Sequence, residues 1–145
     1  MIGRRLEPMY MTETEYLAFE NASDIRHQFI NGDVVAMAGA SRAHNFIVAN
    51  VFGGLEPQLR SKGCRPFGSD MRVRTPNLMR SYPDIAIVCG KPDFADDKGV
   101  DVLLNPSVII EVLSPSTEGY DFGRKFVSYC TIPEFCEYIL IEQTH

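Results

Sequence analysis

The chain has 145 residues, of which 45% are hydrophobic and 23% are charged, and its formal net charge is −5. This length suits one folded domain, and the composition excludes an intrinsically disordered chain. The acidic balance argues against a protein that coats nucleic acid through bulk positive charge. It does not exclude a metal-dependent enzyme, whose carboxylates count as negative until the cation binds.

The four cysteines, Cys64, Cys89, Cys130 and Cys136, are irregularly spaced and form no Cys-x-x-Cys motif. We therefore expect buried free thiols in a reducing cytoplasm, rather than disulfides or a zinc site. The sequence has no signal peptide and no apolar stretch long enough to span a membrane. Both absences favour a cytoplasmic protein without a membrane partner.

The N-terminal part of the chain predicts a helix, a hairpin and a longer helix. Thr12–Glu15 has the pattern of a capping box, which predicts a short helix from about Glu13 to Asn21. Asn31-Gly32 lies between two apolar runs and favours the positive φ angles of a tight hairpin turn. Ser41 can cap a helix that extends to about Ser61, in which Pro57 predicts a kink or a break.

Two polar residues of this part are of interest. Gln28 is central in the first strand of the predicted hairpin, and His44 is near the start of the long helix. A site could use His44, but a satisfied structural histidine or an exposed one is the simpler interpretation.

The segment Cys64–Thr75 is typical of one bent strand or two short strands. Arg72 and Arg74 alternate with uncharged residues, which places both arginines on one face. This face is either a solvated strand surface or a pair of phosphate contacts close to a site.

Two short apolar runs, Ile85–Val88 and Val108–Ile110, are rich in β-branched residues and predict buried strands. Asp84 precedes the first run, and Glu111 lies within the second strand. An isolated ionised carboxylate buried there would cost several kcal/mol, so Glu111 needs a partner. If the strands are neighbours, the two carboxylates converge and can share a metal ion. Otherwise, Asp84 caps a turn and Glu111 pairs with a buried arginine.

The C-terminal part predicts a loop, a helix and a last strand. Lys91–Gly99 is rich in aspartate but fits no EF-hand, and we expect a solvated loop. A helix follows from Glu118 or Gly119 to about Cys130, and Cys136–Ile141 forms the last strand. Lys125 lies at the edge of the apolar stripe of this helix, so that it can reach over the sheet towards Glu111. The alternative is a surface pair with the aspartate four residues earlier.

This order of elements resembles the PD-(D/E)XK nuclease superfamily, and within it the Uma-type family of proposed restriction endonucleases. The segments that carry the resemblance are Asn31–Asp33, Met37–Ser41 with His44, Ser69–Val73, Tyr82–Ile85, Glu111–Thr117, Asp121, Lys125 and Tyr129, and Glu137-Tyr138. They cover nearly the whole chain, and their combination is specific although each is weak alone. The resemblance implies an α/β, restriction-endonuclease-like fold with a central mixed β-sheet flanked by helices.

The resemblance also implies a metal-dependent nuclease that hydrolyses phosphodiester bonds in DNA, with Asp84 and Glu111 as ligands of Mg²⁺ or Mn²⁺. In the superfamily a lysine follows the glutamate by two residues, but this chain has Leu113 there. Lys125 is the implied replacement. The family tends to have a glutamate just before the first hairpin turn, where this chain has Gln28, an amide without charge.

We expect residues 1–145 to form a single domain. Family members usually continue beyond the strand of Glu137-Tyr138, so we expect this chain to be either a fragment or a short form. An unpaired edge strand would favour a homodimer. The alternative function is a catalytically weak binding or assembly module, in which Glu111 only pairs with Lys125 structurally. A toxin-like nuclease acting on RNA would differ only in its substrate.

Overall fold

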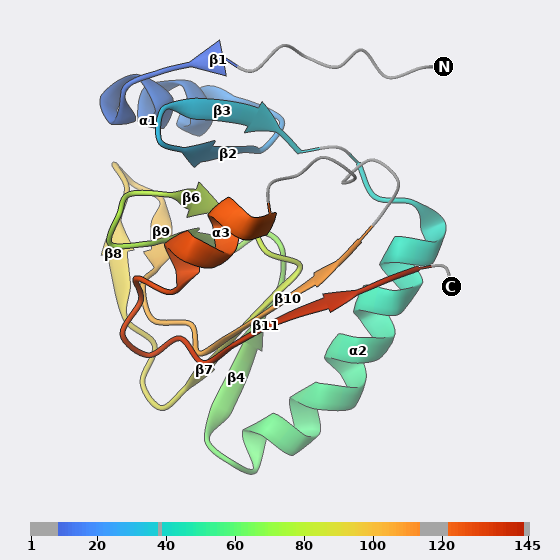
Figure 1. Cartoon of the computed structure of the whole chain (residues 1–145). Coiled ribbons are helices and arrows are strands. Elements are labelled where there is room, and N and C mark those ends of the chain that lie inside the picture. Colours follow the sequence, from blue (N-terminus) through green and yellow to red (C-terminus); the bar gives the residue numbers. More distant parts are fainter. Residues whose placement is uncertain (1–8, 38, 114–121, 144–145) are drawn as a thin grey trace.

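The computed structural model describes residues 9–37, 39–113 and 122–143. Within these ranges the chain forms a seven-stranded and a four-stranded β-sheet, together with three helices (Figure 1). The helices are α1 (Glu13–Ala22), α2 (Arg42–Arg60) and α3 (Phe122–Tyr129). The strands are β1 (Met9–Tyr10), β2 (His27–Ile30), β3 (Asp33–Ala36), β4 (Cys64–Phe67), β5 (Arg72–Arg74), β6 (Arg80–Ser81), β7 (Ile85–Cys89), β8 (Phe94–Asp96), β9 (Asp101–Leu103), β10 (Val108–Val112) and β11 (Glu137–Ile141).

Helix α1 and the β2–β3 hairpin form as the sequence predicts. The hydroxyl of Thr12 accepts a hydrogen bond from the backbone N–H of Glu15, whose carboxylate accepts one from the N–H of Thr12. This capping box fixes the start of α1. The hairpin turns at Asn31 and Gly32, which both have positive φ angles, of 48° and 89°. The helix packs on the hairpin through Tyr16, whose ring stacks on Phe29.

The seven-stranded sheet has the strand order β1-β3-β2-β6-β5-β9-β8. Its β8–β9 end corrects the expected solvated loop at Lys91–Gly99, because Asp97 is only 2% exposed. The carboxylate of Asp97 accepts hydrogen bonds from Arg72, Arg74 and Arg80. These arginines come from β5 and β6, and their positive charges offset the desolvation cost of burying an ionised aspartate. The spacing of the aspartates within Lys91–Gly99 does not reveal these arginine partners.

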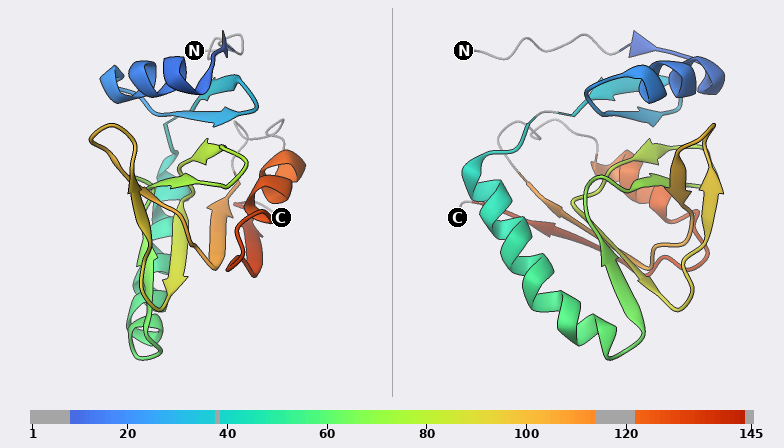
Figure 2. Two further views of the ribbon diagram at one scale, coloured as in Figure 1. Left: turned by 90° about the vertical axis from the view of Figure 1, so that its left-hand side faces the viewer. Right: turned by 180° about the vertical axis from the view of Figure 1, so that it is seen from behind.

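The four-stranded sheet has the order β11-β10-β7-β4 and carries the residues of interest. Strands β10 and β7 are antiparallel, with Ile110 opposite Ile85, whereas β10 and β11 are parallel. Apolar residues of α2 pack against Ile85, Ile87 and Ile110, so α2 covers one face of this sheet (Figure 2). The alternate residues of the strands point into a core shared with the larger sheet and α3. This second face carries the candidate site.

Helix α2 is one continuous helix from Arg42 to Arg60, and Pro57 lies in its last turn. A break at Pro57, one of the two outcomes that the sequence predicts, does not occur. The segment Cys64–Thr75 forms two short strands, β4 and β5, and these belong to different sheets. No helix among the described residues has the length and apolarity needed to cross a membrane.

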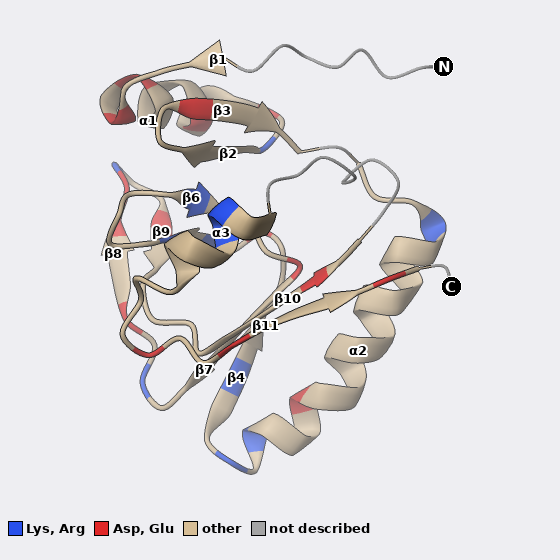
Figure 3. Ribbon diagram, viewed as in Figure 1, with Lys and Arg blue, Asp and Glu red and all other residues tan. Residues whose placement is uncertain are grey.

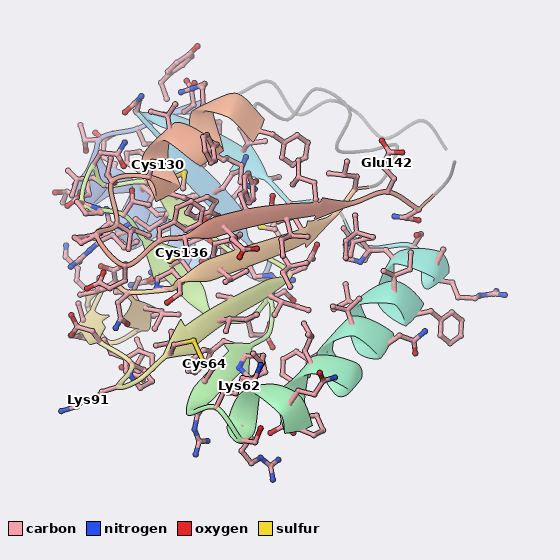
Figure 4. The ribbon with its side chains drawn as sticks, turned by 60° about the horizontal axis from the view of Figure 1, so that its bottom comes forward. Lys62, Cys64, Lys91, Cys130, Cys136 and Glu142 are labelled. Atoms are coloured by element: carbon pink, nitrogen blue, oxygen red, sulfur yellow. A yellow bond between two sulfur atoms is a disulfide. The ribbon has the colours of Figure 1, made fainter. Side chains whose placement is uncertain are left out.

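The expected free thiols are wrong for one pair of cysteines. Cys64 of β4 lies directly opposite Cys89 of β7 in the antiparallel register, and the two form a disulfide with their Cα atoms 4.0 Å apart (Figure 4). Cys130 and Cys136 are free but exposed, not buried. The register of β4 with β7, which are separated in the chain by β5 and β6, brings the first pair together. The irregular spacing of the cysteines along the sequence does not reveal this pairing.

Reduction of the Cys64–Cys89 disulfide should destabilise the protein. The bond closes a loop with a sequence separation of 25, and such a cross-link contributes about 3 kcal/mol by restricting the unfolded chain. We expect a reductant to lower the melting temperature by about 10 °C, as measured by circular dichroism. The double variant Cys64→Ser/Cys89→Ser should melt at the lower temperature with or without reductant. The matched control Cys130→Ser/Cys136→Ser should keep the full reductant effect, and an unchanged wild-type melting temperature would refute the prediction.

Candidate functional site

Asp84 and Glu111 lie at the same end of two paired strands. Asp84 immediately precedes β7, and Glu111 is the fourth residue of β10. Because Ile85 is opposite Ile110 in the antiparallel register, the next pair along the ladder is Asp84 with Glu111. The backbone N–H of Val112 donates a hydrogen bond of 2.8 Å to Oδ2 of Asp84. The strands are therefore neighbours, and the two carboxylates lie close together, as expected for paired strands.

Asp84 is mostly buried and has a second partner. Nε2 of His44 lies 3.2 Å from the same oxygen, Oδ2. Burial raises the pKa of Asp84 above its usual range, and the nearby negative charge of Glu111 raises it further. The hydrogen bond from Val112 and the contact with His44 offset part of this effect. These two contacts therefore offset only part of the free-energy cost of ionising the mostly buried Asp84.

Glu111 is only 7% exposed, and both of its oxygens accept hydrogen bonds. Nζ of Lys125 donates to Oε1, and the hydroxyl of Tyr138 donates to Oε2 at 2.5 Å. Lys125 is itself 4% exposed and lies on the buried side of α3, above the sheet. Figure 3 shows basic positions on α3 and an acidic position on β10, and the ion pair of Lys125 with Glu111 joins these two elements. The predicted reach of Lys125 towards Glu111 is observed, whereas its alternative partner, Asp121, lies outside the described residues.

His44 is not exposed and contacts Asp84 of the candidate site, and both a structural and a functional role for this histidine stay predictions. Ser41 caps α2, and its hydroxyl accepts a hydrogen bond of 3.1 Å from the backbone N–H of His44. The cap holds His44 in the first turn of α2, next to Asp84. Nδ1 of its ring is buried and has no hydrogen-bond partner in the part of the chain that the structure describes. The sequence signal for this contact is a histidine in the first turn of a capped helix. Whether that histidine reaches Asp84 depends on how α2 packs on the four-stranded sheet, which the sequence pattern does not give.

Gln28 is buried in β2 with 4% exposure. Alternation places it on the face of β2 that carries Ile30, which packs in the core shared with Tyr129 of α3, and not on the face of Phe29. Gln28 therefore faces the side of the hairpin on which the site lies. No hydrogen bond joins its amide to Asp84 or Glu111 among the described residues.

Arg72 and Arg74 are not brought to the carboxylate pair. Arg72 is 4% exposed, and its guanidinium donates to Asp97, to the side chain of Asn21 and to the hydroxyl of Tyr82. Arg74 is more accessible and also donates to Asp97. These bonds give both arginines a structural role at the β8–β9 end of the larger sheet. Phosphate contact through either residue stays a prediction.

The donor set fits a small, hard cation better than a zinc-type site. Among the described residues, no three His, Cys, Asp or Glu side chains are grouped so that they could together hold a metal ion. Mg²⁺ keeps several of its waters and is commonly held by one or two carboxylates. Asp84 and Glu111 are such a pair, and a cation beside them would relieve the mutual repulsion that helps to raise the pKa of Asp84.

Comparison with known proteins gives consistent matches. Residues 13–145 match the Uma2 family, which is described as "Putative restriction endonuclease". "Uncharacterized protein sll1609" of Synechocystis sp. is 37% identical over 134 residues, which are 92% of this chain and 75% of that protein. "Uncharacterized protein slr1290" of the same organism is 31% identical over 135 residues, with 92% and 70% covered.

A solved structure has the same fold as this chain. It is the crystal structure of "a putative nuclease belonging to DUF820" from Anabaena variabilis, which superposes with a TM-score of 0.73 at 16% sequence identity. The match covers 91% of this chain and 74% of that chain. The α/β, restriction-endonuclease-like fold expected from the sequence is thereby confirmed.

Asp84→Asn should stabilise the metal-free protein near neutral pH. Because the folded state raises the pKa of Asp84, the folded protein binds the carboxyl proton more tightly than the unfolded chain, and the ionised group destabilises the fold above that pKa. We expect a higher melting temperature for Asp84→Asn than for wild type at pH 7. The difference should shrink as the pH falls through the raised pKa towards the usual carboxyl range. Calorimetry in the presence of a chelator checks this, and a variant that is less stable at pH 7 and equally so at low pH would contradict it.

Proposed function

Because the chain belongs to the Uma2 family, we propose that it is a metal-dependent endonuclease that hydrolyses phosphodiester bonds in DNA. The observation that supports this most strongly is the buried constellation of Asp84, Glu111 and Lys125 on one face of the four-stranded sheet. Two carboxylates and one ammonium group, held by three different elements, are a costly arrangement that packing alone does not require.

In this proposal Asp84 and Glu111 hold Mg²⁺ or Mn²⁺, with water molecules as the remaining ligands. The bound cation would polarise a phosphoryl oxygen and lower the pKa of a water molecule bound to it. Oδ2 of Asp84 is held by the N–H of Val112 and faces Nε2 of His44. These contacts fix the carboxylate in one orientation, so little conformational freedom remains to be lost on binding.

Lys125 is the candidate for stabilising charge that develops at the phosphate. Its ammonium group is buried, and its contact with Glu111 keeps it over the sheet. A fixed cation in a site shielded from water stabilises developing negative charge more strongly than a solvated one. Gln28 contributes no charge, so we assign the electrostatic roles to Asp84, Glu111 and Lys125.

A catalytically weak binding or assembly module is the second candidate. The observation in its favour is that Lys125 and Tyr138 already satisfy both oxygens of Glu111 without any metal. In that case the three residues would form only a structural network. The two candidates differ in their response to divalent cations, since only the enzyme requires one at Asp84 and Glu111.

Cleavage assays on supercoiled plasmid, single-stranded DNA and RNA, each with Mg²⁺ or Mn²⁺, test the proposal. Glu111→Gln keeps the shape of the side chain but removes its charge, and we expect it to lower the cleavage rate by about 100-fold or more. The matched control is Glu137→Gln, which makes the same chemical change at an exposed position of β11.

A chelator should abolish cleavage by the wild type, and the control should cleave at the wild-type rate. A folded wild-type protein that neither binds Mn²⁺ nor cleaves any of the three substrates would favour the binding module. Cleavage of RNA alone would keep the enzyme and change its substrate.

A further inference from the structure

Tyr138 contacts Glu111 from a strand that carries no charged site residue. It is the second residue of β11 and lies beside Ile109 in the parallel register with β10. Paired residues of neighbouring strands project from the same face, and Glu111 shares that face with Ile109. The hydroxyl of Tyr138 therefore points along the sheet towards Glu111 and donates a hydrogen bond of 2.5 Å to Oε2.

The ring of Tyr138 is held on two sides by aromatic residues. It stacks on Phe126 of α3 with the ring planes 8° apart, and it meets the ring of Tyr129 edge to face with centroids 5.4 Å apart. These two ring contacts hold the hydroxyl in place, and its hydrogen bond to Oε2 fixes the position of that oxygen.

The hydrogen bonds from Tyr138 and Lys125 restrain Glu111 in complementary ways. Lys125 donates to Oε1 from above the sheet, whereas Tyr138 donates to Oε2 from the adjacent strand. A carboxylate that accepts a hydrogen bond at each oxygen is restrained against rotation about its last bond, so its unused lone pairs keep a preferred direction. Each oxygen can still accept a further interaction, because a carboxylate has about four lone-pair sites.

We propose that Tyr138 is a positioning residue that orients Glu111 for binding the divalent cation. The inference rests on the proposed function, in which Glu111 is a ligand. Groups that hydrogen-bond to metal ligands from behind typically contribute a factor of about 10 to 100 in metal affinity. Strand β11 then contributes a residue to the proposed metal site in addition to pairing with β10.

Tyr138→Phe tests this proposal by removing one oxygen atom and keeping the ring. The chain offers a matched control in Tyr129→Phe, because Tyr129 is a buried tyrosine of the same aromatic cluster whose hydroxyl bonds to Ser81 at 2.7 Å instead of to Glu111. Binding of Mn²⁺ is measured by electron paramagnetic resonance, which detects the free ion. We expect Tyr138→Phe to weaken Mn²⁺ binding by about 10-fold, and Tyr129→Phe to leave it within about two-fold of wild type.

A second measurement keeps the test valid if either variant is less stable. The rise in melting temperature that saturating Mn²⁺ gives to each variant is compared with the same variant's own metal-free value. This rise should be smaller for Tyr138→Phe than for Tyr129→Phe. Equal losses of Mn²⁺ affinity in the two variants, or unchanged or tighter binding by Tyr138→Phe, would overturn the inference.

Failure of the proposed function has a different signature. If Asp84→Asn and Glu111→Gln bind Mn²⁺ as tightly as wild type, the carboxylates are not ligands, and the proposed function itself fails. If those two variants lose binding but Tyr138→Phe does not, only the role of Tyr138 is wrong.

Discussion

The antiparallel pairing of β7 with β10 is the constraint on which the site depends. It brings the residue before one strand level with the fourth residue of the other, so that Asp84 and Glu111 meet at one end of the sheet. Each surrounding element then adds one group to this pair. Helix α2 adds His44, α3 adds Lys125 and β11 adds Tyr138. A slip of one residue in this register would turn one carboxylate to the face covered by α2, so that the two carboxylates would no longer lie together.

Two of the buried acidic centres among the described residues, Asp97 and the pair of Asp84 with Glu111, have their charges balanced differently. Burial alone would raise the pKa of Asp97, but hydrogen bonds from Arg80 and Arg72 hold it below its usual value. Asp97 is therefore stable as an anion and joins the strands of the larger sheet. Asp84 has a raised pKa and no such surplus of positive charge. In the Asp97 cluster the arginines balance the buried charge and stabilise the fold. At Asp84 and Glu111, by contrast, a bound cation would lower the electrostatic cost of holding two carboxylates close together.

Features encoded in nearby residues could be predicted from the sequence. The capping box at Thr12, the Asn31-Gly32 turn and the apolar strands beside Asp84 and Glu111 are of this kind, and the helical stripe gave the direction of Lys125. Features that depend on register between distant strands could not. The Cys64–Cys89 disulfide and the three arginines around Asp97 follow from such pairings. The same holds for His44 and Tyr138, whose roles depend on where α2 and β11 lie relative to a sheet that is completed elsewhere in the chain.

The parallel attachment of β11 also bears on how the protein is made. Its strand pairs along the full length of β10, and Tyr138 supplies one of the two donors that hold Glu111. During synthesis, β7, β10 and α3 leave the ribosome before β11 does. A chain synthesised only as far as α3 therefore carries Asp84, Glu111 and Lys125 without the hydrogen bond from Tyr138 to Glu111. Completion of the Glu111 geometry depends on β11, the last of the described strands to be synthesised.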